Sequence, residues 1–151
     1  MPSSFPGMNR VEFRTATSQD LLEIMALDHL TATDSGRVKF IKVSVANGSC
    51  FVAKAGEQIA GYAVLTYSFF HFGFVELLYV RESMRRNGVG RALLGKLEEI
   101  CVTSKLFTST NESNLPMRHL LSACGFSPSG RVENIDPGDP ELIFFKLLER
   151  C

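Results

Sequence analysis

The feature that most restricts the fold is an almost wholly apolar run, Phe72–Val80, with an amphipathic pattern a few residues later. A short run without polar alternation is typical of a strand that is buried in a sheet. The loop after it contains Gly88 and Gly90, and the next apolar residues share one helical face, at Leu93, Leu97, Ile100 and Cys101. We therefore predict a buried strand that leads through a glycine-bearing loop into a helix over Gly90–Val102.

Strands and helices alternate along the rest of the chain. Period-two patterns and turn residues predict strands over Val11–Arg14, Cys50–Ala55, Ile59–Tyr67, Lys105–Thr110, Phe126–Ile135 and Leu142–Leu148. Helical spacing predicts a helix after Thr17, whose distance from Asp20 suits a capping box, and another over Leu115–Ala123. The segment Asp34–Ala46 fits a helix or a strand. We favour a helix, although Asn47-Gly48 after it suits a turn as well as a helix C-cap.

Nothing in the sequence divides the chain, since it contains no repeat, linker or low-complexity tract. We expect a single α/β (α+β) domain over residues 10–151, after a flexible N-terminus at residues 1–9. The 16 basic residues balance the 16 acidic ones, which argues against nucleic acid as a partner. No apolar run approaches the ~18 residues of a membrane span, and residues 1–10 lack the apolar stretch of a secretory signal.

Cysteine usage favours a reducing compartment. The four cysteines lie far apart, none belongs to a CxxC pair, and only three histidines occur. Neither a metal site nor a disulfide framework is indicated. We therefore expect a cytoplasmic protein that binds no metal, with Cys101 and Cys124 as buried structural thiols.

The loop between the apolar strand and the helix is a candidate phosphate site. Gly88 and Gly90 would let the backbone approach a ligand closely, because no Cβ blocks the way. The first amides of the helix lack helical partners and carry the positive end of the helix dipole, which suits phosphate oxygens. Arg85, Arg86 and Arg91 add positive charge. The alternative, in which the glycines make only a turn and the arginines are solvated, stays open.

Two common phosphate-binding motifs do not fit this loop. A P-loop requires Lys and then Ser or Thr after its last glycine, and neither Gly88 nor Gly90 is followed by them. The dinucleotide fingerprint GxGxxG fails because Leu93 occupies the third glycine position. Both nucleotide motifs are therefore excluded.

The segment Arg85–Gly90 matches the signature [Q/R]xxGx[G/A], and the chain here resembles the GCN5-related N-acetyltransferase (GNAT) family. The second segment of that family, NxxAxxLYxxxGF, resembles this chain at Asn114, Met117, Leu120 and Gly125-Phe126. The resemblance extends from about Val11 to Leu148. It implies a mixed, mostly antiparallel central sheet flanked by about four helices, and acetyl-coenzyme A as co-substrate.

The resemblance also implies which residues hold acetyl-coenzyme A, in an opening between the strand ending at Val80 and the next strand. The backbone of Leu78, Tyr79 and Val80 would pair with the pantetheine arm, and Asn114 would contact that arm from the other side. The pyrophosphate would lie against the loop and its amides, at Arg85, Arg86, Asn87, Gly88, Val89, Gly90 and Arg91.

Glu76 is the candidate catalytic residue. It is the only carboxylate in the apolar strand, where an unpaired charge would be costly to bury. A salt bridge to a neighbouring Arg, or exposure at an edge, would satisfy it. As a general base it would instead face the acceptor amine, and polyamine acetyltransferases of the family are similar in placing a glutamate four residues before the valine that matches Val80.

One position departs from the family pattern. Many relatives carry a tyrosine where this chain has Leu121, and that tyrosine protonates the departing thiolate. Tyr79, His119 or water would have to substitute. The departure keeps two functions open, an N-acetyltransferase that uses Glu76 and a non-catalytic acyl-coenzyme A binding or sensing domain.

The acceptor is the least defined part of the prediction. We expect a primary amine of a small molecule rather than of a protein or peptide, and a homodimer is possible. The run from Tyr67 to Phe72 lies where relatives build part of the acceptor pocket, but so many aromatic residues favour the core.

Overall fold

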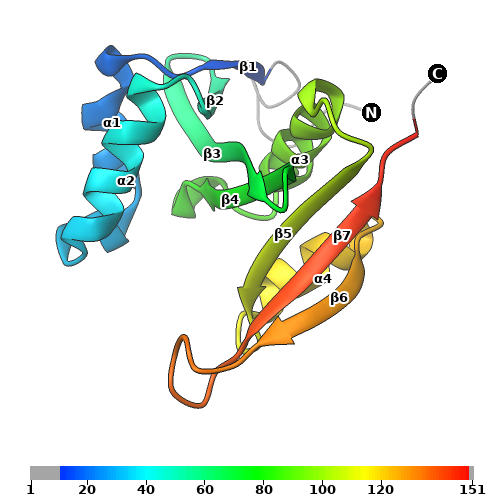
Figure 1. The fold of residues 1–151 in the computed structure, drawn as a ribbon. Coiled ribbons are helices and arrows are strands. Elements are labelled where there is room, and N and C mark those ends of the chain that lie inside the picture. Colours follow the sequence, from blue (N-terminus) through cyan, green and yellow to red (C-terminus); the bar gives the residue numbers. More distant parts are fainter. Residues whose placement is uncertain (1–10, 150–151) are drawn as a thin grey trace. The chain divides into compact units, whose positions relative to one another are not determined.

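The computed structural model describes residues 11–149. Its seven strands are β1 (Glu12–Thr15), β2 (Cys50–Ala55), β3 (Gln58–Phe69), β4 (Phe72–Val80), β5 (Lys105–Asn111), β6 (Ser127–Val132) and β7 (Glu141–Leu147). The four α-helices are α1 (Leu21–Leu27), α2 (Ser35–Ala46), α3 (Val89–Ile100) and α4 (Leu115–Ala123). The strands follow the order β1-β2-β3-β4-β5-β7-β6 (Figure 1). Because β4 and β5 are parallel and most other pairs are antiparallel, the predicted mixed sheet is confirmed.

The predicted elements occur with small shifts at their ends. The segment that fitted either a helix or a strand is the helix α2, with Asn47 as its C-cap. The strand predicted over Phe126–Ile135 is shorter in the structure, because β6 ends at Val132. None of the helices in residues 11–149 has the length and apolar character needed to span a membrane. The predicted flexible segment 1–9 lies outside the described residues, and the single domain over residues 10–151 stays a prediction.

The described residues form two compact units, which we treat in turn. The first comprises residues 11–65 and 77–96. Its core contains the fully buried Ile24, Ile41 and Val52, with Tyr62 and Tyr79 in the same cluster. The predicted capping box is present at Thr17, the N-cap of the 3-10 turn Ser18–Asp20 that leads into α1, where the Thr17 amide donates to Asp20 Oδ2 at 2.8 Å.

The second unit comprises residues 66–76 and 97–149. Here β5 pairs with β7 along its whole length, from Lys105 opposite Leu147 to Asn111 opposite Glu141. Buried and half-buried residues alternate along β5, and Leu106, Thr108 and Thr110 form its buried side. Figure 1 shows α4 behind β5, β7 and β6, so one face of these strands is covered by a helix.

The strand β4 differs from its prediction in burial. Only Gly73, Val75 and Tyr79 are buried, and the other residues of the strand are half-buried. The expectation of a strand buried on both faces was therefore wrong. Gly73 lies on the face of β4 that packs inward, because a Cβ there would lie 2.5 Å from Cys101 Sγ. Phe72 and Phe74 point to the opposite face, which is less buried.

Candidate functional site

The loop between β4 and α3 has the backbone of an anion site. Arg86 and Gly88 have φ angles of +65° and +85°, and the first ladder bond of α3 runs from the Ala92 amide to the Gly88 carbonyl at 2.9 Å. The amides of Gly88, Val89 and Gly90 precede this bond. A Cβ built on Gly88 would meet no heavy atom within 4 Å, so no side chain or backbone crowds this position of the loop. The loop can therefore accept a phosphate group.

Arg85 ties this loop to the end of β4. Its Nε donates to the Val80 carbonyl at 3.0 Å, and its guanidinium lies 5.0 Å from the centroid of the Tyr79 ring. Asn87 Nδ2 donates to the Arg85 carbonyl at 2.9 Å and closes the turn. The sequence predicted positive charge at Arg85, and the structure adds that this side chain supports the loop.

A close approach of β3 holds the end of β4 and the start of α3 together. A Cβ on Gly61 would lie 2.9 Å from the Tyr79 carbonyl oxygen and 3.1 Å from Leu93 Cδ1. Only glycine fits without displacing one of these neighbours. The Arg81 amide then donates to the Ala60 carbonyl at 2.7 Å, which fixes the strand end.

A buried carboxylate, Asp28, lies next to Tyr79 and was not singled out from the sequence. It is 0% exposed and accepts hydrogen bonds from the Tyr62 hydroxyl and from Arg37 Nε, the latter at 2.8 Å. Burial of the Tyr62 hydroxyl, and then its hydrogen bond to Asp28, raise the pKa of Tyr62. The nearby Leu30 amide also donates to Asp28 Oδ1, at 3.0 Å, but Tyr62 is 34 positions away, so no local pattern could have revealed the whole cluster.

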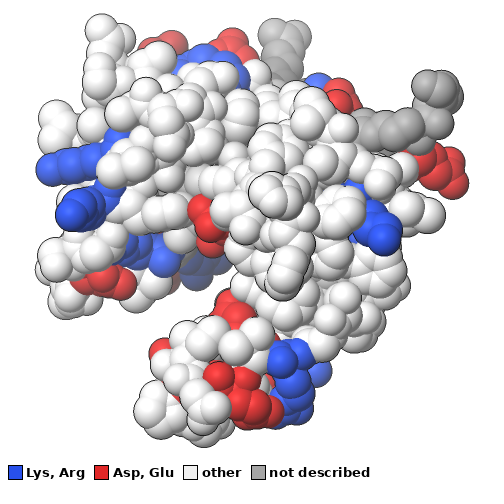
Figure 2. All heavy atoms as spheres, viewed as in Figure 1, with Lys and Arg blue, Asp and Glu red and all other residues white. Residues whose placement is uncertain are grey.

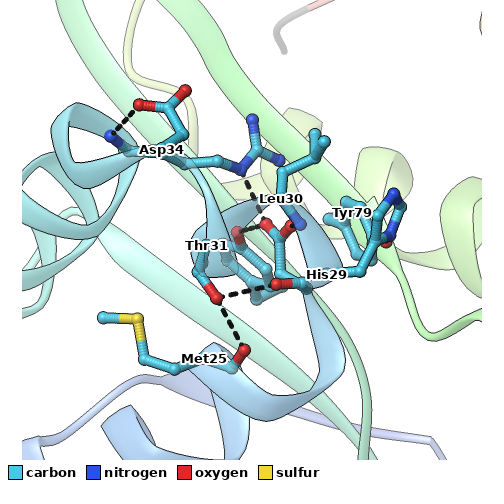
Figure 3. A network of polar contacts seen from close by, with 9 residues as sticks. Met25, His29, Leu30, Thr31, Asp34 and Tyr79 are labelled. Carbon is cyan, nitrogen blue, oxygen red and sulfur yellow. Dashed lines mark hydrogen bonds and ion pairs between the residues drawn. The ribbon is translucent and has the colours of Figure 1, made fainter.

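The Tyr79 side chain belongs to the same cluster (Figure 3). Its hydroxyl lies 2.5 Å from His29 Nδ1, and its ring lies 6.2 Å from that of Tyr62. The Arg37 guanidinium lies 5.7 Å from the Tyr79 ring centroid. We call Asp28, His29, Arg37, Tyr62 and Tyr79 the Asp28 network.

Glu76 lies in the second unit and is half-buried. Among residues 11–149 it forms no ion pair, and its Oε1 accepts a long hydrogen bond of 3.4 Å from Ser68 Oγ. The salt bridge considered for this residue is therefore absent from the described part of the chain. A half-buried carboxylate with one weak donor has room for a further hydrogen-bonding partner.

Asn114 and Leu121 also lie in the second unit, on α4. The Asn114 side chain caps the helix by accepting from the Met117 amide at 3.2 Å, and Asn114 itself is exposed. Leu121 is 1% exposed and fills the core. Of the two predicted structural thiols, Cys101 is buried and Cys124 is half-buried.

A family model and solved structures both match this chain. Residues 17–126 match the model of the acetyltransferase (GNAT) family. A crystal structure of a GNAT-family acetyltransferase from Bacillus cereus ATCC 10987 is 36% identical, with a TM-score of 0.86, over 93% of this chain and 99% of that one. The chain belongs to the GNAT acetyltransferase family. Comparison with curated proteins yields no match.

More distant GNAT structures share the fold. The ribosomal-protein-S18-alanine N-acetyltransferase from Escherichia coli is 18% identical, with a TM-score of 0.76, over 93% of this chain and 96% of that one. The yncA structure from Salmonella typhimurium, which contains its cofactor acetyl-CoA, is 17% identical, with a TM-score of 0.71, over 93% of this chain and 95% of that one. At these identities the likeness concerns the fold alone.

Proposed function

We propose that this GNAT-family protein is an acetyl-coenzyme A-dependent N-acetyltransferase whose acceptor is the primary amine of a small molecule. The observation that carries the proposal is the open, glycine-bearing loop at the start of α3, in a chain of this family. Glu76 supplies the chemistry on the acceptor side. A protein or peptide amine and a purely binding role are the competing possibilities, and the assays below separate them.

The residues of the loop fit a coenzyme A pyrophosphate. The position of Gly88 is uncrowded, the amides of Gly88, Val89 and Gly90 precede the α3 ladder, and Arg86 is an exposed cation in the same loop. Backbone amides at a helix start hold phosphate oxygens without a dedicated side chain. In this proposal the backbone of Leu78, Tyr79 and Val80 continues the site toward the pantetheine arm, and Asn114 contributes from α4. Acetyl-coenzyme A supplies the activated acetyl group as a thioester.

Glu76 acts as the general base. An alkyl ammonium has a pKa near 10.4, so about 4 kcal/mol separates it from the nucleophilic amine at neutral pH. The Glu76 carboxylate takes one proton from the ammonium, directly or through one water. The amine nitrogen then bonds to the acetyl carbon as the carbon–sulfur bond breaks, and the electron pair of that bond leaves with the sulfur. The nitrogen loses its surplus proton to water, which leaves the neutral amide.

Leu121 cannot protonate the departing sulfur. A thiol has an ordinary pKa of about 8.5, so a thiolate is a tolerable leaving group, and water can return the proton to it. Turnover therefore does not require the tyrosine that many relatives carry at this position.

The substitution Glu76→Gln tests the base. Turnover should fall by about 10²–10⁴-fold at neutral pH and partly recover at high pH, where free amine is abundant. Thiol release from acetyl-coenzyme A with a panel of small amines and a peptide measures it, and calorimetry should show unchanged coenzyme A affinity. Glu57→Gln, in the exposed β2–β3 turn, is the control. Parent-like turnover of Glu76→Gln would return Glu76 to a structural role.

The substitution Gly88→Val tests the loop. A branched side chain would fill the open space and should weaken coenzyme A binding by more than tenfold, or about 1.4 kcal/mol. Gly48→Val is a matched control, because Gly48 has a φ of +80° and equally open surroundings at the end of α2. Both glycines have similar positive φ angles, so a difference in calorimetric affinity between the two variants supports the site. Equal affinities of the two variants would remove the cofactor assignment.

A further inference from the structure

A group of phenylalanines covers the face of the second unit that α4 leaves open. Phe107 is at its centre, with ring centroids 4.9 Å from Phe69, 5.7 Å from Phe72 and 6.0 Å from Phe145. Phe69 also stacks on Phe74 at 5.0 Å and meets Phe70 edge-on at 5.0 Å. We call these six residues the phenylalanine face. The sequence favoured a core role for the run from Tyr67 to Phe72, and this was wrong, since none of its aromatic residues is buried.

The phenylalanine face is open rather than packed. Phe69, Phe72, Phe74, Phe107 and Phe145 are half-buried, and Phe70 is 79% exposed. In the view of Figure 2 the surface over β5 and β7 is mostly white, and charged atoms gather at the β6–β7 loop instead. Contiguous apolar surface of this kind marks a binding site more often than a structural one.

The turn that carries Phe70 is strained. Phe70 and His71 have φ angles of +53° and +69°, a combination that two-residue hairpin turns reserve for Gly, Asn or Asp. Bulky residues rarely adopt positive φ, and such strain gathers at functional positions. The strained turn keeps the exposed Phe70 ring beside Phe69. A smaller residue that adopts positive φ more readily would remove this ring from the phenylalanine face.

Charge at the edge of the face indicates what would bind it. Glu76 is two residues from Phe74 on β4, so the two side chains lie on the same face of the strand and the carboxylate borders the rings. An ammonium already lies on this face, since Lys105 Nζ is 5.6 Å from the centroid of Phe72. Aromatic faces attract cations, and a carboxylate beside them favours a cationic group over a neutral one.

We propose that the acceptor is an arylalkyl primary amine, which lies with its aromatic ring on the phenylalanine face and its ammonium at Glu76. This inference rests on the proposed function, because Glu76 is the base of that reaction. The rings hold the apolar body of the amine, and the carboxylate selects and deprotonates its nitrogen. A second copy of this chain is the competing occupant of the same face.

The test compares 2-phenylethylamine with ethylamine in the thiol-release assay. Both carry one primary ammonium, so a difference in kcat/KM reports the aromatic body. The parent should prefer 2-phenylethylamine by about tenfold or more. Phe70→Ala should raise the KM for 2-phenylethylamine several-fold with little change in kcat, and should leave ethylamine unaffected. Leu22→Ala, at an apolar residue of α1 that is 86% exposed, is the control.

Four outcomes decide the matter. A preference for 2-phenylethylamine that Phe70→Ala and Phe107→Leu both reduce supports the inference. Equal use of both amines, or a preference that these variants leave intact, overturns it while the proposed function stands. Failure of every amine in the panel overturns both. A parent dimer that Phe70→Ala converts to monomer in sedimentation assigns the face to a second copy and also overturns the inference.

Discussion

The two most distinctive clusters in the molecule are built from opposite chemistry. The Asp28 network is polar and lies around a carboxylate that is 0% exposed, whereas the phenylalanine face is apolar and half-exposed. Among the described residues, no buried side-chain nitrogen or oxygen lacks a hydrogen-bond partner. Buried polar groups are costly unless all are satisfied, so a satisfied network cannot change without destabilising the fold. Exposed rings contribute less to stability, and their arrangement is better explained by binding.

The largest expected effect is on the Asp28 network. Asp28→Ala removes the acceptor of both Tyr62 and Arg37 and leaves a guanidinium and a hydroxyl without their partner. We expect the free energy of unfolding to fall by about 3–5 kcal/mol, measured by urea denaturation. Asp34→Ala, which removes the exposed N-cap of α2, should cost only about 1 kcal/mol. Similar losses in the two variants would mean that the network contributes no more to stability than one exposed helix cap.

A smaller loss is expected where the backbones approach most closely. Gly61→Ala places a methyl group 2.9 Å from the Tyr79 carbonyl oxygen, a backbone atom that cannot rotate away. We expect a loss of about 1–3 kcal/mol in unfolding free energy and weaker coenzyme A binding, because the end of β4 must shift. Gly95→Ala in α3 is the matched control, since its Cβ meets nothing within 4 Å. A Gly61→Ala protein as stable as Gly95→Ala would show that the approach is not tight.

The capping box before α1 should give a smaller, pH-dependent effect. The hydrogen bond from Arg14, and then that from the Thr17 amide, lower the pKa of Asp20 from 3.8 to about 2. Because the pKa is lower in the folded state, this stabilisation is complete above pH ~4 and is lost as the pH falls toward 2. Asp20→Asn should therefore lower stability by about 1–2 kcal/mol at pH 7, allowing for solvent screening, and the gap from the parent should close in acid. Chemical denaturation at pH 7, 4 and 2.5 measures it, and a gap that is constant with pH would contradict the assignment.

Local patterns predicted the elements well and the clusters poorly. The loop, α3 and α4 follow from signals within a few residues, such as Gly88 in the loop and the helical spacing over Leu115–Ala123. The Asp28 network joins Asp28 to Tyr62, which is 34 positions away, and His29 to Tyr79, which is 50 positions away. No periodicity reports such distant pairs. The location of Glu76 on β4 was predictable, but its exposure was not, because exposure depends on which distant segments pack against the strand.

The smallest expected change in stability is at Phe70, and it separates the phenylalanine face most sharply from the Asp28 network. Phe70→Asn replaces an exposed ring at positive φ with a residue that tolerates this conformation. Its packing loss is small at 79% exposure, so relief of strain should dominate and the midpoint of thermal unfolding should rise by about 1–3 °C. His71→Asn, in the same turn without a ring contact to Phe69, should stabilise similarly. Only Phe70→Asn should also raise the KM for 2-phenylethylamine. If Phe70 serves to bind the amine, Phe70→Asn should be more stable than the parent and should bind 2-phenylethylamine more weakly. If Phe70→Asn instead melts below the parent, the ring contributes to the fold and the contrast between the two clusters fails.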